Sequence, residues 1–122
     1  YIESLKLSNL KVVGFLEDED LINLFSESKF YVQLSEHEAF GCSVIEAGIC
    51  GCNLIVSDKA ALPEVVKDNG YHCSPDSIDI IKSYIVKHIE TPAFSPEIIS
   101  KNLLQKFSFL KRKEDLIKIL NK

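Results

Sequence analysis

The sequence lacks methionine altogether, even at position 1. Because a translated reading frame should begin with methionine, we expect the chain to be part of a longer product or to have lost its first residues. Long hydrophobic runs are also missing, since no apolar stretch approaches the ~18 residues that a membrane-spanning helix requires. No signal-peptide pattern follows Tyr1. We therefore expect a cytoplasmic protein without a spanning helix in this sequence.

A surplus of positive charge is also absent. The chain has 14 basic and 18 acidic residues, and its formal net charge is −4. A nucleic-acid partner requires a basic surface, so this balance argues against nucleic acid as a primary partner. The short basic run Lys111-Arg112-Lys113 is interpreted as a solvated helix face.

The four cysteines do not have the spacing of a zinc site. Cys50 and Cys52 are separated by one residue, whereas zinc knuckles typically use two. His72 and Cys73 could complete a ligand set. However, three of the cysteines fall in or beside predicted helix and strand core, where free cysteine behaves as a small hydrophobe. We therefore expect no metal site and reduced thiols.

The length of 122 residues suits one domain with a real core and is too short for two. Hydrophobic residues make up 46% and charged residues 26%, which is typical of a folded soluble protein. Apolar patterns and turn residues predict strands at 10–15, 30–34, 53–57 and 71–73. They predict helices at 20–28, 42–50, 62–68, 76–89, 96–107 and 109–120, a helix tail over 1–9, and a linker over 91–96.

Strands alternate with helices over about the first 90 residues. This order predicts an α/β fold, with a Rossmann-like parallel sheet covered by helices on both faces. Four strands are fewer than the five or six of a complete doubly wound domain, so we expect one or two strands to precede Tyr1. We interpret 1–122 as a single domain that lacks its N-terminal strand or strands, with 91–122 as its C-terminal helices.

Two glutamates flank the point at which a predicted strand gives way to a predicted helix. Glu38 lies in the loop after strand 30–34, and Glu46 lies about one turn inside the next helix. Ligands of α/β sheets bind at such loops, and the free N–H groups of a first helical turn attract phosphate. Two carboxylates do not bind that phosphate. We therefore expect them to bind a neutral, hydroxyl-rich group beside it, such as a sugar.

Structural interpretations of these residues stay open. Glu38 could be an ordinary exposed loop acid. Glu46 has apolar or small neighbours, which predicts a helix buried over most of its circumference, where a carboxylate is costly unless hydrogen-bonded. An acid near a helix N-terminus also gains from the helix dipole. His37 is interpreted as an exposed loop residue and Asp58 as a capping or turn residue.

Four segments together resemble the C-terminal half of the retaining glycosyltransferases of GT-B fold, of the group 1 or family 4 type. Residues 12–16 resemble the V-x-F-x-G strand, and residues 35–46 resemble the S-x-x-E-x-F-G-x-x-x-x-E element, known as the E-x7-E motif. Residues 51–57 resemble the G-x-P-V-I-x-S strand, and residues 62–66 resemble the P-E-V-V helix. A lone E-x7-E is weak, but four segments in the family's order make the resemblance specific over about residues 10–75.

The resemblance implies a domain that binds a nucleotide-sugar donor. Glu38, as the catalytic residue, would contact hydroxyls of the donor sugar, and Glu46 would bind the ribose hydroxyls. The other implied donor contacts are the backbone around Phe40, Gly41, Cys42 and Ser43 for the sugar and diphosphate, and Phe15 and Leu16 for the base. The implied reaction is a retaining hexosyl transfer from an NDP-sugar to a glycan, glycolipid or polysaccharide acceptor. It would use neither a metal nor another cofactor.

The chain also departs from the family pattern. Asn53 replaces the usual proline of the third segment, and Gly48-Ile49 replaces the usual Met-Ala. Both are interpreted as packing changes, with Gly48 admitting a neighbouring segment. The family's basic pair that clamps the diphosphate and its acceptor-binding N-terminal domain have no counterpart in this sequence. Charge-assisted bonds contribute roughly 1.5–3 kcal/mol each, so we expect this chain alone to be catalytically inert and to bind nucleotide weakly.

Two other function classes are left open. A receiver-type phosphoacceptor domain has a similar length and alternation, and Asp18-Glu19-Asp20 with Asp58 could imitate its acidic pocket. That hypothesis does not explain Phe40-Gly41 or Glu46. A degenerate, non-catalytic glycosyltransferase-like subunit would instead act by pairing with another protein. Enzymes of the resembled family often work at the inner membrane face, so peripheral association there is left open as well.

Overall fold

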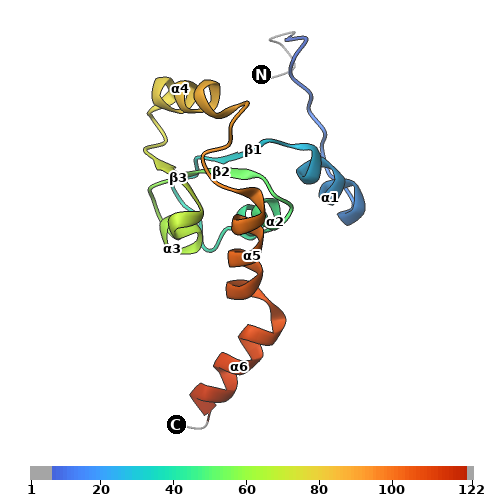
Figure 1. Ribbon diagram of the computed structural model, residues 1–122, viewed down its shortest axis with the longest axis vertical. Helices are drawn as coiled ribbons and strands as arrows, with labels where there is room; N and C mark the ends of the chain where they lie inside the picture. The colour runs from blue at the N-terminus through green and yellow to red at the C-terminus, as the bar shows by residue number, and fades with distance from the viewer. Residues whose placement is uncertain (1–6, 121–122) are drawn as a thin grey trace.

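The computed structural model describes residues 7–120 and contains a three-stranded parallel sheet in the order β1-β2-β3 (Figure 1). The strands are β1 (Phe30–Gln33), β2 (Asn53–Ser57) and β3 (Gly70–Cys73). Phe30 lies opposite Asn53 and Leu54 lies opposite Gly70. Since all three strands run in the same direction, their carboxyl ends lie at one edge of the sheet, where the connecting loops can form a site.

Helices cover both faces of this sheet, and the predicted α/β, Rossmann-like fold is confirmed. One side of the sheet carries α2, α3 and α5, whereas α4 lies on the other side (Figure 1). The helix bounds are α1 (Asp18–Glu27), α2 (Cys42–Ile49), α3 (Leu62–Val66), α4 (Ile78–His88), α5 (Pro96–Phe107) and α6 (Phe109–Leu120), with a short 3-10 turn η2 (Lys67–Asn69). None of the helices within residues 7–120 has the length and apolar character needed to cross a membrane.

The central strand β2 joins two core clusters. Every residue of β2 is buried, as its nearly continuous apolar sequence predicts for a strand covered on both faces. Leu54 and Val56 point into the cluster shared with α1, α2, α3 and α5, and Ile55 points into the cluster shared with α4. This alternation follows from the two-residue period of a strand.

The predicted strand over 10–15 is wrong. Residues 10–14 have no regular secondary structure, and Phe15 is 89% exposed. A strand requires a neighbour with which to exchange backbone hydrogen bonds, and β1, β2 and β3 pair with one another instead. The sheet of residues 7–120 therefore has three strands rather than the predicted four. The predicted helix tail over 1–9 falls partly outside the described residues, and Ser8 and Asn9 form a turn.

Most other element boundaries differ from the prediction by one or two residues. Helix α1 begins at Asp18 rather than at 20, and its N-cap Glu17 makes no side-chain capping bond. The predicted helix over 62–68 divides into α3 and η2, and Lys67 has a positive φ of 48°. Strand β2 and helices α5 and α6 have the predicted bounds.

Two departures from the family pattern are explained by packing. A Cβ atom at Gly48 would meet the buried Cδ1 of Leu103 on α5 and would lie 3.0 Å from Cδ1 of Leu54. Glycine therefore lets α2 and α5 approach closely. Asn53 is buried at the start of β2, and its Oδ1 accepts a hydrogen bond from the backbone N–H of Phe94 at 3.3 Å. That bond ties the segment before α5 to the sheet.

Candidate functional site

The loop between β1 and α2 forms the centre of the candidate site. It follows the carboxyl end of β1 and ends at Gly41, the N-cap of α2, which has φ 88° and ψ 52°. Only glycine adopts this left-handed conformation without steric cost. A Cβ atom there would also lie 2.9 Å from Cδ2 of Leu62 on α3. Gly41 therefore sets both the turn into α2 and the contact with α3.

The carboxylate of Glu38 is held inside this loop. Its Oε1 accepts hydrogen bonds from the backbone N–H groups of Phe40 at 3.3 Å and Gly41 at 3.1 Å. Its Oε2 accepts a bond from Nε2 of Gln33, the last residue of β1, at 2.7 Å. The backbone carbonyl of Glu38 accepts a further bond from the N–H of Ala61. The side chain is half-buried, so Glu38 is not an ordinary exposed loop acid.

Helix α2 is buried over much of its circumference, as predicted, but Glu46 lies on its exposed stripe and is not the buried carboxylate that its neighbours suggested. Val44, Ile45 and Ala47 are buried, but the carboxylate of Glu46 faces solvent. It stands beyond the first turn of α2, which contains no acidic residue, so the helix dipole acts on it weakly. An exposed carboxylate of this kind is free to accept hydrogen bonds from a ligand.

Residues 40–43 carry four backbone N–H groups, but not all four are free to bind a ligand. The N–H groups of Phe40 and Gly41 already donate to Glu38. Cys42 and Ser43 are exposed and begin the helix, where backbone N–H groups have no intrahelical acceptor. Among residues 40–43, the free anion-attracting donors are therefore the N–H groups of Cys42 and Ser43.

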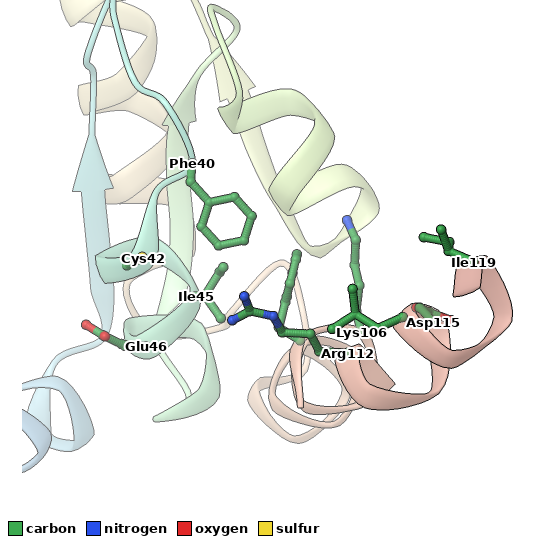
Figure 2. Close-up of a pocket in the computed structure, with 10 residues that line it drawn as sticks. Phe40, Cys42, Ile45, Glu46, Lys106, Arg112, Asp115 and Ile119 are labelled. Carbon is green, nitrogen blue, oxygen red and sulfur yellow. The ribbon is translucent and has the colours of Figure 1, made fainter. Parts of the chain in front are cut away.

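A cavity of ≈ 700 Å³ opens beside this turn, between α2 and the two C-terminal helices (Figure 2). Its wall combines apolar side chains with charged ones, and its lining residues are Phe40, Cys42, Ile45, Glu46, Lys106, Phe107, Arg112, Asp115, Leu116 and Ile119. The ring of Phe40 meets that of Phe107 edge to face, with 5.7 Å between the ring centroids. This contact anchors the loop against α5.

Two basic side chains, Lys106 and Arg112, line the cavity. Lys106 donates from Nζ to the backbone carbonyls of Glu64 at 2.7 Å and Val65 at 3.1 Å, near the end of α3. Burial lowers the pKa of Lys106, and the charge of Lys67 acts in the same direction. Figure 2 shows the guanidinium of Arg112 pointing toward α2. Arg112 is exposed, as expected for a solvated helix face, and it also lines the cavity.

Phe15 and Leu16 stand apart from the loop in the chain, in the segment just before α1. Phe15 is largely exposed and Leu16 is half-buried. A shallow groove of ≈ 230 Å³ between α1 and α2 is lined by Glu46 together with Asp18, Leu21, Ile22, Phe25 and Cys50. Glu46 thus lines both the large cavity and the groove beside α1, and Figure 2 shows its carboxylate pointing away from Arg112.

The acidic pocket of the receiver-type hypothesis does not form. Asp18, Glu19 and Asp20 make the first turn of α1, and residues 7–17 contain no strand before them. Asp58 follows β2, is exposed, and lies 3.7 Å from Nζ of Lys59. His37 is exposed, as predicted. Within residues 7–120, no group of three His, Cys, Asp or Glu side chains is arranged to hold a metal ion.

Sequence reasoning missed the residues that other elements bring to the loop. Tyr31 and Gln33 reach it from β1, and Lys106, Phe107 and Arg112 reach the cavity from α5 and α6. One local signal was available. Gln33 stands at the carboxyl end of an apolar strand, and its side chain lies on the same strand face as that of Tyr31, two positions earlier. The C-terminal residues carried no such signal.

Mildly alkaline iodoacetamide is expected to modify Cys42 well before Cys52 or Cys73. The thiolate is the reacting form, and Cys42 is exposed. Burial raises the pKa of the Cys52 thiol to about 11, and burial together with the charge of Asp58 raises the pKa of Cys73. Mass-spectrometric peptide mapping of partly alkylated protein measures the order. Early modification of Cys52 in the folded chain would contradict this packing.

Comparison with known proteins places this arrangement in a family. Residues 1–120 match the family described as "Glycosyl transferases group 1". The chain is 30% identical over 100 residues to "O-antigen chain mannosyltransferase B" of Escherichia coli, covering 82% of this chain and 26% of that protein. It is 34% identical over 105 residues to "Serotype-specific mannosyltransferase WbdA" of Escherichia coli, covering 86% of this chain and 13% of that protein.

A eukaryotic relative also matches. The chain is 34% identical over 68 residues to "tRNA-queuosine alpha-mannosyltransferase" of Drosophila melanogaster, covering 55% of this chain and 18% of that protein. In each case the chain spans only a minor part of the relative's length, 26% at most among these three.

Proposed function

This chain belongs to the glycosyl transferases group 1 family, and we propose that its β1–loop–α2 unit binds the nucleotide-sugar donor of a retaining glycosyltransferase. The observation that carries the proposal is the combination of Glu38, two helix N-terminal N–H groups and exposed Glu46 around one loop. Such a unit offers phosphate-binding donors beside hydroxyl-binding acceptors. Residues 1–122 would then act as one donor-binding domain.

Each part of the donor has a proposed partner. The diphosphate lies at the first turn of α2, near the N–H groups of Cys42 and Ser43, with Phe40 and Gly41 shaping the loop around it. Glu46 accepts hydrogen bonds from the ribose hydroxyls, and Glu38 contacts hydroxyls of the sugar. Phe15 and Leu16 border the base at the α1 side of Glu46. Helix N–H groups offset phosphate charge, so the proposal includes no metal or other cofactor.

The donor sugar we propose to test first is mannose. Three relatives carry the word mannosyltransferase in their names, and one of them names the O-antigen chain. We accordingly propose a hexosyl, specifically mannosyl, transfer to a glycan, glycolipid or polysaccharide acceptor, with no nucleic acid as a primary partner. A cytoplasmic location, peripheral to the inner membrane face, suits the assembly of such an acceptor. The acceptor would be bound by a part of the protein other than this donor-binding unit.

The 122-residue chain is proposed to be inactive on its own. The basic pair that the resemblance leads us to expect beside the diphosphate has no counterpart in its sequence, and each missing charge-assisted bond weakens binding by roughly 1.5–3 kcal/mol. A degenerate subunit that binds no donor is the competing outcome. Turnover of a nucleotide-sugar by the purified chain would contradict the proposed inactivity.

An amide-resolved NMR titration with UDP, GDP, ADP and GDP-mannose tests donor binding directly. Shifts are expected at residues 40–46 and at 15–16, and the nucleotide that produces them identifies the base. The same ligands are then added to the protein encoded by the full reading frame that contains this chain. Absence of binding in both proteins at millimolar ligand would contradict the proposal and favour the degenerate subunit.

A further inference from the structure

We propose that Tyr31 and Gln33 are positioning residues that leave Oε2 of Glu38 as the atom that binds the sugar hydroxyl. The inference rests on the proposed function, because it concerns how Glu38 is presented to the donor. Both residues lie on β1, outside the loop and outside α2. Neither belongs to the set of donor-contacting residues that the resemblance implies.

The geometry forms a continuous hydrogen-bonded chain. Gln33 donates from Nε2 to Oε2 of Glu38 at 2.7 Å, and its Oε1 accepts from the hydroxyl of Tyr31 at 2.9 Å. Tyr31 and Gln33 are two residues apart on one strand, so their side chains leave the same face of the sheet. The ring of Tyr31 packs edge to face against Phe25, with 5.6 Å between the ring centroids. That contact holds the hydroxyl in place.

The direction of each bond follows from the chemistry of the groups. An ionised carboxylate only accepts, so the glutamine must turn its NH₂ group toward Glu38 and its carbonyl oxygen toward Tyr31. The tyrosine hydroxyl then donates to that oxygen. Burial raises the pKa of Tyr31, while a hydrogen bond with the Ser43 side chain lowers it. The hydroxyl remains protonated at neutral pH and keeps its role as a donor.

An inventory of acceptor sites separates the two oxygens of Glu38. Each carboxylate oxygen offers about two lone-pair sites. Oε1 accepts from both Phe40 and Gly41 and is therefore full. Oε2 accepts from Gln33 and keeps one site for a ligand hydroxyl. Oε1 thus holds the loop, and Oε2 is left to bind the sugar.

Ser43 lies in the first turn of α2, where the proposed diphosphate site begins. A change in Gln33 should affect the sugar end alone, because Gln33 bonds to Glu38 and not to this turn.

The test compares Gln33→Leu, Gln33→Glu and Tyr31→Phe in the protein encoded by the full reading frame that contains this chain. Dissociation constants are measured for a nucleotide-sugar and for its matching nucleoside diphosphate. Gln33→Leu removes the bond to Oε2 and is expected to weaken the nucleotide-sugar about tenfold. The nucleoside diphosphate should change by less than about twofold, since its partners lie on α2. The melting temperature should stay within about 2 °C of the wild type.

The other variants keep the inference falsifiable. Gln33→Glu preserves size but replaces the N–H donor by a like charge, so it should weaken the nucleotide-sugar at least as much as Gln33→Leu. Tyr31→Phe keeps the ring packing and should weaken nucleotide-sugar binding about threefold. Gln105→Leu, at an exposed position of α5, is the matched control and should change neither constant.

The outcomes separate the inference from the proposed function. Equal nucleotide-sugar affinity in wild type and in both Gln33 variants would overturn the positioning role alone. Parallel loss of nucleotide-sugar and nucleoside diphosphate with a lower melting temperature would assign Gln33 a merely structural role and would also overturn it. If the wild-type protein binds neither ligand, the proposed function fails and the positioning role fails with it.

Discussion

Replacement of Glu46 by glutamine is expected to weaken nucleotide-sugar binding about 10- to 100-fold and to leave the fold intact. A carboxylate that accepts two hydroxyl hydrogen bonds loses charge assistance and one acceptor oxygen in this change, and each such bond contributes roughly 1.5–3 kcal/mol. Because Glu46 is exposed and stands beyond the first turn of α2, the free energy of unfolding should change by less than about 0.5 kcal/mol.

Isothermal calorimetry on the protein encoded by the full reading frame measures this loss, and urea denaturation measures stability. Glu27→Gln is the matched control, since Glu27 is exposed at the end of α1 and lines none of the grooves beside α2. Its affinity should equal that of the wild type. If Glu46→Gln bound the nucleoside diphosphate as tightly as the wild type does, the ribose contact assigned to Glu46 would be wrong.

Replacement of Gly41 by alanine is expected to cost about 2–5 kcal/mol of stability and to abolish measurable donor binding. A non-glycine residue in the left-handed region costs about 1–2 kcal/mol, and overpacking against a buried side chain costs about 1–3 kcal/mol. Gly41 meets both conditions, because its φ is 88° and an added Cβ would lie 2.9 Å from Cδ2 of Leu62. Relief of this clash would move the loop that holds Glu38.

Gly14→Ala isolates the backbone contribution. Gly14 also has a positive φ, 66°, but an added Cβ there meets no atom of residues 7–120 within 4 Å. We therefore expect the backbone cost alone, a loss of about 1–2 kcal/mol. Urea denaturation of both variants gives the comparison. Equal losses at the two positions would show that the contact between Gly41 and Leu62 does not limit the loop.

The elements that the sequence predicted best are those with strong local signals. Strand β2 is nearly all apolar and is followed by polar residues, and its predicted bounds agree with the structure. Helix α2 begins after Gly41 and ends before Gly51, two glycines whose positive φ values mark its ends. In both cases the signal depends on neighbouring residues alone, so it could be recognised without the rest of the fold.

The predictions that failed depended on partners far away in the chain. Leu10, Val12 and Val13 have the apolar character of a strand, but they are exposed and pair with no strand of the described sheet. The apolar neighbours of Glu46 suggested burial, yet a helix packed on one side still leaves a solvent-facing stripe. A sequence pattern shows which residues are apolar, and packing decides which face is covered.

The sequence by itself determined the order of strands and helices from α1 onward, the family, and the positions of Glu38 and Glu46 on either side of the start of α2, because these follow from local pattern and spacing. Only the tertiary structure decided that Oε1 of Glu38 closes the loop, that Gln33, bonded in turn to Tyr31, donates to its Oε2, and that Arg112 lines the cavity beside α2. The physical reason is that such contacts join side chains from separate elements, and their distances exist only once the helices have packed on the sheet.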